Sequence, residues 1–143
     1  MTTRLDYTQA SPEGYKAFGG VYVYLQNSGL PKALIDLVYL RVSQINGCAF
    51  CIDMHSRDLL KQGLAVDKLV LVPVWREAGA LFHAREGAAL AWAETLTHVS
   101  EKGAPDALYE PLKAHFSDVE ISDLTLAVAL MNAFNRLAVG MNL

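Results

Sequence analysis

Residues 40–55 read LRVSQINGCAFCIDMH, and this segment carries the strongest chemical signal in the chain. If residues 48–55 are helical, Cys48 and Cys51 are three apart and His55 follows one turn later. At about 3.6 residues per turn, all three side chains then point to one face. Two cysteines at this spacing can bridge, because a disulfide needs Cα atoms about 4.4–6.8 Å apart. The segment predicts a reactive cysteine pair served by a histidine.

Gly47 is expected to place Cys48 at the start of this helix, where unpaired amides and the positive end of the dipole stabilise a thiolate. His55 can take or return the thiol proton, because the pKa of histidine lies near neutrality. Such a histidine is often oriented by a carboxylate. Asp36 and Asp53 are the nearby candidates, although Asp53 is expected to lie off the face that carries the cysteines and histidine.

Turn and capping signals divide the chain around this segment into helices. A serine cap at Ser11 and Pro12 at the first helical position predict a helix from about residue 12 to residues 27–29, despite strand propensity at residues 21–24. Pro31 begins a second helix that ends near residues 46–47. The helix with the cysteines then ends near Gly63.

Later signals predict helices at about residues 84–98 and 106–115. Residues 69–72 could form a strand on composition, but Pro73 follows at once. Ser117 and Glu120 form a capping box ahead of a very apolar final helix. A helix this apolar is buried on most sides, in a core or in a subunit interface. The sequence therefore predicts an all-α helical bundle, with residues 1–143 as one domain.

The chain has 143 residues, of which 52% are hydrophobic and 19% charged, with a formal net charge of −3. No basic stripe indicates nucleic acid, and no basic amphipathic segment indicates a membrane surface. The longest uncharged apolar segment, residues 124–135, is too short to span a bilayer, and residues 1–14 do not resemble a secretory signal. We therefore expect a cytoplasmic protein, in which a close cysteine pair is more often catalytic or metal-binding than structural.

Residues 40–55 resemble the core signature of the alkylhydroperoxidase D-like (AhpD-like) proteins of the carboxymuconolactone decarboxylase superfamily. A looser similarity extends over about residues 10–140, through residues 74–77, 85–94 and the final helix. The resemblance implies an all-α fold that assembles into homo-oligomers. The decarboxylase branch of the superfamily generally lacks the cysteine pair, so its presence here argues against that activity.

The resemblance also implies a peroxidase cycle. Cys51 would attack the peroxide and become a sulfenic acid, Cys48 would resolve it to a disulfide, and His55 would move the proton. Asp36 occupies the position of a family glutamate that works with the histidine, one methylene shorter. The backbone could adjust, a water could bridge, or the relay could be weaker.

On this interpretation the protein is a peroxiredoxin-type oxidoreductase whose substrate is a hydroperoxide. It needs no bound cofactor, because electrons pass through the cysteine pair. A lipoylated or thioredoxin-like dithiol donor would reduce the pair again. Three alternatives remain open at this point: a redox sensor or thiol–disulfide exchange protein without fast turnover, a structural zinc site built from Cys48, Cys51, His55 and Asp36, and a purely structural disulfide or inert thiols.

Overall fold

A computed structural model describes residues 2–143, and within that range every regular element is a helix. The all-α prediction is therefore confirmed. The elements in chain order are α1 (Tyr7–Ala10), α2 (Pro12–Gln26), α3 (Lys32–Asn46), α4 (Ala49–Lys61), α5 (Val66–Val70), the 3-10 helices η1 (Val72–Glu77) and η2 (Gly79–Leu81), α6 (Ala84–Thr97), α7 (Val99–Lys102), α8 (Asp106–Tyr109), the 3-10 helix η3 (Glu110–Ala114) and α9 (Asp118–Met141).

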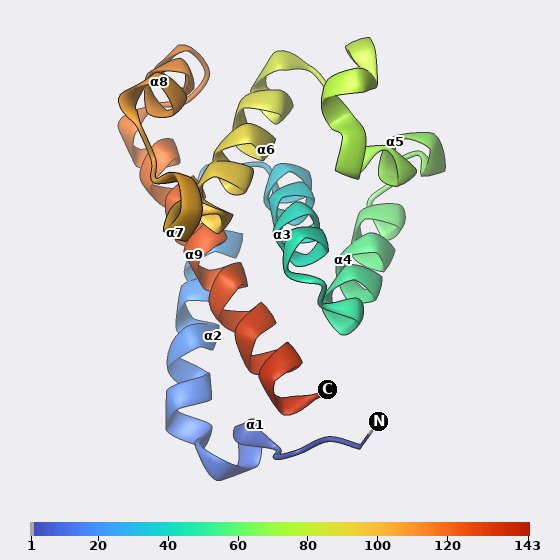
Figure 1. Ribbon diagram of the computed structural model, residues 1–143, viewed down its shortest axis with the longest axis vertical. Coiled ribbons are helices and arrows are strands. Elements are labelled where there is room, and N and C mark those ends of the chain that lie inside the picture. The colour runs from blue at the N-terminus through green and yellow to red at the C-terminus, as the bar shows by residue number, and fades with distance from the viewer. Residues whose placement is uncertain (1) are drawn as a thin grey trace.

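Helix α3 lies at the centre of the bundle and contacts α4, α6 and α9 (Figure 1). Its apolar residues are buried almost all round, from Leu34 to Val42. One side packs with α2, α6, α9 and η3, and the other packs with α4, α5 and η1. Each fully buried leucine contributes about 1.5–3 kcal/mol. The helix that precedes the cysteines is therefore held firmly from both sides.

Helix α9 begins with the predicted capping box, in which the backbone of Glu120 donates to Ser117 and the side chain of Glu120 accepts from the backbone of Ser117. It is longer than the apolar run read from the sequence, and by length and composition alone it could cross a membrane. Core helices share this property. Here Leu124, Ala127 and Val128 are fully buried against the rest of the bundle.

Helix α2 confirms that residues 21–24 are helical, but its start differs in detail from the expectation. Ser11 is the N-cap residue and Pro12 the first helical residue, as predicted, but the side chain of Ser11 makes no capping bond. Leu25 is the one buried residue of this helix. Helices α1 and α2 and the end of α9 extend from one side of the bundle (Figure 1).

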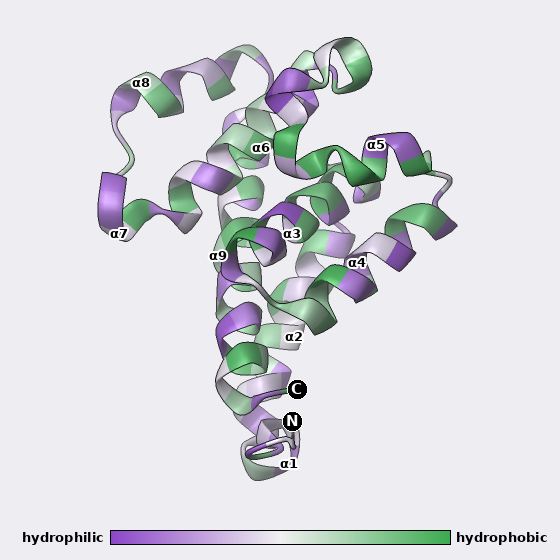
Figure 2. Ribbon diagram, turned by 45° about the vertical axis from the view of Figure 1, so that its right-hand side comes forward, coloured by the Kyte–Doolittle hydropathy of each residue, from purple (hydrophilic) through white to green (hydrophobic). Residues whose placement is uncertain are grey.

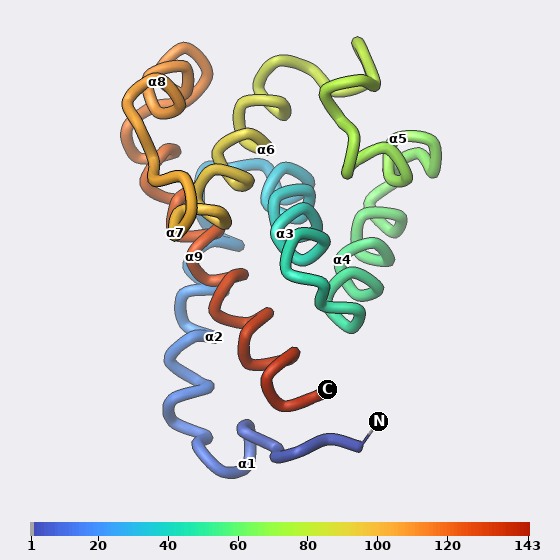
Figure 3. The backbone as a smooth tube through the Cα atoms, viewed as in Figure 1, coloured from blue at the N-terminus to red at the C-terminus, as the bar shows by residue number. Residues whose placement is uncertain are grey.

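The structure decides one segment that was ambiguous in the sequence and divides another that was expected to be a single helix. Residues 69–72 form no strand but lie in α5 and the start of η1, and the hydrophobic stretch that joins them packs against α3 (Figure 2). Pro111 lacks the N–H that an uninterrupted α-helix needs, and residues 106–115 accordingly divide into α8 and η3. The backbone trace brings the two termini close together, where Arg4 N–H donates to the carbonyl of Met141 at 2.9 Å (Figure 3).

Candidate active site

The turn between α3 and α4 sets the position of the cysteine pair. Gly47 ends α3 in the left-handed conformation, with φ of 68°, which glycine adopts without a Cβ penalty. Cys48 is the N-cap of α4, and its Sγ accepts the backbone N–H of Cys51 at 3.3 Å. The prediction that Gly47 places Cys48 at the helix start is confirmed. An amide and the helix dipole thus both face the sulfur of Cys48.

The side chains of α9 hold this turn from the opposite side. Asn46, the last residue of α3, donates from its amide to the side-chain oxygens of Asn132 and Asn135, each at 3.0 Å. Asn135 in turn donates to the hydroxyl of Ser43. Asn135 is fully buried and Asn46 and Asn132 are half-buried, and the hydrogen bonds among them fix the end of α3 and, with it, the start of α4.

Cys48 and Cys51 form a disulfide, with their Cα atoms 5.3 Å apart. Both residues are almost fully buried, at 2% and 3% exposure. The bond packs against Ala138 of α9 in a small cluster of its own. The spacing argument is therefore confirmed in its geometric part: the pair lies within bridging distance and is oxidised in this structure.

His55 follows Cys51 by one turn on α4 and is buried at 2% exposure. Neither ring nitrogen has a hydrogen-bonding partner among residues 2–143, and the ring centroid lies 5.3 Å from that of Tyr39. Burial lowers the pKa of His55 from its ordinary 6.5 to about 4, and the negative charge of Asp58 opposes that change. At neutral pH the oxidised protein therefore holds an uncharged imidazole beside the disulfide.

Asp36 is buried on α3 and accepts a hydrogen bond from the side-chain amide of Gln62. It makes no hydrogen bond to His55. Burial raises the pKa of the Asp36 carboxyl above its ordinary value, and the bond from Gln62 opposes the rise. The other candidate acid, Asp53, is exposed and pairs with Arg57 at 2.9 Å, so it lies away from the site as expected.

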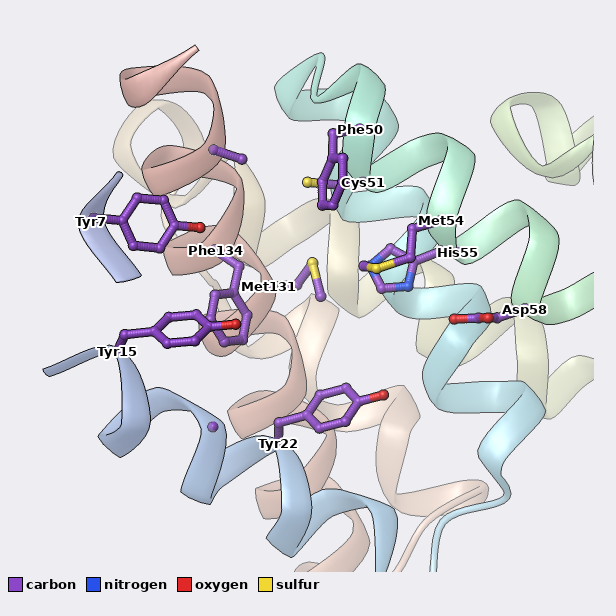
Figure 4. Close-up of a pocket in the computed structure, with 12 residues that line it drawn as sticks. Tyr7, Tyr15, Tyr22, Phe50, Cys51, Met54, His55, Asp58, Met131 and Phe134 are labelled. Atoms are coloured by element: carbon purple, nitrogen blue, oxygen red, sulfur yellow. The ribbon is translucent and has the colours of Figure 1, made fainter. Parts of the chain in front are cut away.

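The sequence analysis did not assign three further residues of this region to the site. Gln62 holds the carboxylate of Asp36, and Tyr39 presents a fully buried hydroxyl that has no partner among residues 2–143. Asp58 lies three residues after His55 on α4, and Figure 4 shows its carboxylate pointing toward the imidazole. The spacing of His55 and Asp58 was a usable signal, because side chains three apart on a helix are neighbours. Nothing in the sequence pointed to Gln62.

A cavity of about 300 Å³ opens in front of Cys51 and His55, between α4 on one side and α1, α2 and α9 on the other (Figure 4). Aromatic and sulfur-containing side chains dominate its walls. Its lining residues are Tyr7, Tyr15, Gly19, Tyr22, Phe50, Cys51, Met54, His55, Asp58, Met131, Phe134 and Ala138. Phe50, which lies between the two cysteines in the sequence, lines this cavity and is partly exposed. The arrangement can hold an apolar molecule against one sulfur and one imidazole.

The alternative zinc site finds no support in the arrangement of ligands. Within residues 2–143, no three His, Cys, Asp or Glu side chains are grouped so as to hold a metal ion. Both cysteine sulfurs are joined to each other, and Asp36 is bonded to Gln62. The chemistry that the arrangement can perform is thiol–disulfide chemistry with a nearby proton acceptor.

The pKa of His55 leads to a first prediction, on stability. Between pH 4 and 6.5 the unfolded chain binds a proton at this histidine and the folded protein does not, so the free energy of unfolding rises with pH. The pKa difference between the folded and unfolded states corresponds to about 3 kcal/mol of unfolding free energy. This stability is present in full above pH 6.5 and is lost as the pH falls toward 4. We expect denaturant unfolding of the oxidised protein to show this rise and that of His55→Gln to lack it.

The difference in unfolding free energy between the wild-type protein and His55→Gln separates the contribution of His55 from that of Asp36. The raised pKa of Asp36 has the opposite sign, because the folded protein keeps that proton longer as the pH rises. Asp36 is common to both proteins, so its contribution cancels to first order. A difference in unfolding free energy that stays constant from pH 4 to 7 would mean that His55 is not held uncharged by burial.

Known proteins resemble this chain in sequence and in structure. Residues 9–95 match the carboxymuconolactone decarboxylase family. The uncharacterized protein YdfG of Bacillus subtilis is 34% identical over 99% of this chain and 95% of its own length. A segment covering 32% of this chain is 47% identical to 26% of the alkyl hydroperoxide reductase AhpD of Maricaulis maris. The crystal structure of an Agrobacterium tumefaciens protein of unknown function, with a suggested assignment as an antioxidant defence protein AhpD, is 45% identical. It covers 99% of this chain and 96% of its own, with a TM-score of 0.94.

Proposed function

The chain belongs to the carboxymuconolactone decarboxylase family as an AhpD-like member, and on that premise we propose that it is a thiol-dependent peroxidase. The observation that carries the proposal is that the disulfide residue Cys51 and a buried, uncharged histidine one turn further along α4 line the same apolar cavity. One sulfur of the pair, that of Cys51, belongs to the cavity that His55 also lines. A hydroperoxide in this cavity would meet the sulfur and the imidazole together.

The first step makes a nucleophile of Cys51 in the reduced protein. The thiolate is the reactive form, and the uncharged imidazole of His55 is free to accept the thiol proton. The resulting thiolate and imidazolium attract each other in a buried site, so we expect the pKa of His55 to rise when the disulfide is reduced. The low pKa of His55 in the oxidised protein is thus compatible with the role of His55 as a proton acceptor in the reduced protein.

The next steps balance without a further cofactor. The Cys51 thiolate attacks one peroxide oxygen, the O–O bond breaks, and the alcohol leaves with a proton from His55. Cys51 is then a sulfenic acid. The Cys48 thiol attacks the Cys51 sulfur and gives up its proton, the S–O bond breaks, and the departing hydroxide takes that proton and leaves as water as the disulfide forms. The sum is one hydroperoxide and two thiols converted to one alcohol, one water and one disulfide.

The walls of the cavity favour an organic hydroperoxide over hydrogen peroxide. Tyr15, Tyr22 and Phe134 offer ring surfaces, and Met54 and Met131 add flexible apolar contacts. Burial of an apolar substituent contributes binding free energy in proportion to the area removed from water. We therefore expect a lower KM for an aryl-alkyl hydroperoxide than for hydrogen peroxide.

Asp36 and Asp58 provide a second prediction, on the proton relay. We propose that Asp36 supports the imidazolium through its buried negative charge, one turn before Tyr39, whose ring packs against the His55 ring. Asp58 is half-buried and its charge is screened more strongly by water. We expect Asp36→Asn to lower kcat/KM for a hydroperoxide about tenfold and Asp58→Asn to lower it about threefold.

The pair of variants is its own matched control, because each change removes one carboxylate near the same imidazole. Unchanged kcat/KM in Asp36→Asn would remove Asp36 from the relay. If Asp58→Asn were the more damaging variant, the nearby acid on α4 would be the partner of His55. Thermal unfolding of both variants separates these outcomes from a loss of folding.

The proposed activity is tested by peroxide consumption with the reduced protein and excess dithiol, together with thiol counts before and after oxidation. We expect sustained turnover and the loss of two thiols per chain. A disulfide that forms without turnover would favour the alternative of a redox sensor or exchange protein. Thiols that do not react with peroxide would end the peroxidase proposal.

A further inference from the structure

The disulfide lies between two cavities, and each cysteine belongs to a different one. Cys51 lines the cavity of about 300 Å³ that also contains His55, whereas Cys48 lines a second cavity of about 170 Å³. The second cavity lies where the start of α4 meets the end of α9, close to the C-terminal end marked in Figure 1. Its lining residues are Gly47, Cys48, Ala49, Phe50, Ala138, Val139, Asn142 and Leu143.

Phe50 and Ala138 line both cavities, so together with the disulfide they form the wall between them. Ala138 packs directly against the two cysteines. His55 and the tyrosines line only the larger cavity. A molecule in the smaller cavity therefore meets Cys48 without entering the space proposed for the hydroperoxide.

In thiol–disulfide exchange, the direction of attack decides which sulfur is bonded and which is released, so it matters that the two cysteines line different cavities. The incoming thiolate attacks one sulfur in line with the S–S bond, and the other sulfur leaves as a thiolate. Attack from the smaller cavity falls on Cys48 and releases Cys51. Attack from the larger cavity falls on Cys51 and releases Cys48. The cavity that the reductant enters therefore decides which cysteine is freed first.

We propose that the smaller cavity is the entry site for the dithiol reductant, which attacks the sulfur of Cys48. This inference rests on the proposed function, in which each cycle ends with an oxidised pair. The reductant's first thiolate bonds to Cys48, and the S–S bond to Cys51 breaks. The electron pair goes to Cys51, which becomes the thiolate beside His55. The reductant's second thiolate then closes its own disulfide and releases Cys48 as a thiolate.

Both leaving sulfurs have the stabilisation that this order requires. Cys51 leaves next to an imidazole that can be protonated, and Cys48 leaves at an N-cap where the N–H of Cys51 faces its sulfur at 3.3 Å. The size of the cavity admits the dithiol end of a small molecule or of a narrow flexible arm, and excludes a folded domain. The ligand class is therefore a compact dithiol, presented free or at the end of such an arm.

The test measures the two half-reactions separately. Oxidised protein is mixed with dithiothreitol in the absence of peroxide, quenched with acid and alkylated to count thiols over time. Reduced protein is mixed with cumene hydroperoxide and followed in the same way. Val139 is half-exposed on α9, so Val139→Trp can narrow the smaller cavity without changing the core. We expect reduction by dithiothreitol to slow at least about tenfold and oxidation to stay within about twofold of wild type.

Three further variants keep the result interpretable. Val119→Trp makes the same change at the other, exposed end of α9 and should leave both rates unchanged. Ala49→Phe narrows the smaller cavity from α4 and should repeat the effect of Val139→Trp. Met54→Trp narrows the larger cavity and should slow oxidation but not reduction.

Wild-type reduction rates in both Val139→Trp and Ala49→Phe would overturn the proposal. Slower reduction by dithiothreitol in Met54→Trp, with Val139→Trp unaffected, would instead place the reductant in the larger cavity. Because the reduction is measured without peroxide, these outcomes do not depend on peroxidase activity. A wild-type protein that fails to react with cumene hydroperoxide would contradict the proposed function and leave the reduction result standing.

Discussion

Cys51→Ser is expected to lose hydroperoxide turnover by at least about three orders of magnitude, because it removes the nucleophile. Serine is close to cysteine in size, so the buried turn at the start of α4 should keep its shape. Steady-state peroxide consumption with excess dithiol, at one protein concentration, gives the ratio of the two rates. The loss should be the same for small and large hydroperoxides, since every substrate needs the same sulfur.

Cys48→Ser is the matched control, because it removes the same disulfide and leaves Cys51 in place. Without added dithiol, we expect this variant to consume about one peroxide per chain at a rate near that of the wild-type protein's first turnover. Cys51→Ser should consume none under the same conditions. If the two variants behaved in the opposite way, the N-cap cysteine would be the attacking residue, as its helix dipole and amide contact would favour.

His55→Gln is expected to lower kcat/KM about 100-fold near neutral pH, which lies within the usual contribution of a general acid–base group. Glutamine keeps hydrogen-bonding atoms at this position but cannot carry the proton. The loss should shrink as the pH approaches and passes the pKa of the cysteine thiol, because hydroxide then generates the thiolate without help. A pH profile of kcat/KM for both proteins measures this directly.

His98→Gln is a suitable comparison for this variant. His98 lies at the end of α6 and lines neither of the two cavities that contact the disulfide. It should retain the wild-type profile. A uniform loss across the whole pH range in His55→Gln would show that the histidine supports the structure of the site and does not move the proton.

Most of the fold could be predicted from the sequence because its boundaries depend on local chemistry. Pro12, Gly47 and Gly63 mark helix ends, and the capping box at Ser117 and Glu120 marks the start of α9. Local patterns failed where the local preference was weak. Ser11 occupies the cap position without making the bond, and the helix expected at residues 106–115 changes type at Glu110, just before Pro111.

Only the part of the candidate site that lies on α4 was predictable from the sequence. Cys48, Cys51 and His55 lie in one short segment, so helical spacing is enough to bring them together. Asp36 belongs to another helix, and its bond to Gln62 depends on how α3 packs against α4. Spacing along the chain carries no information on that contact. The roles assigned to these four residues, the homo-oligomer and the cytoplasmic location stay predictions.

The identity of the attacking sulfur is the central claim, and trapping its sulfenic acid tests it most directly. Reduced Cys48→Ser protein is treated with one equivalent of cumene hydroperoxide in the presence of dimedone, and the adduct is located by tandem mass spectrometry. We predict a dimedone adduct on Cys51 in most chains, with none on Cys48 when Cys51→Ser is treated in the same way. An adduct on Cys48 in Cys51→Ser, with Cys51 unmodified in the partner variant, would contradict the account.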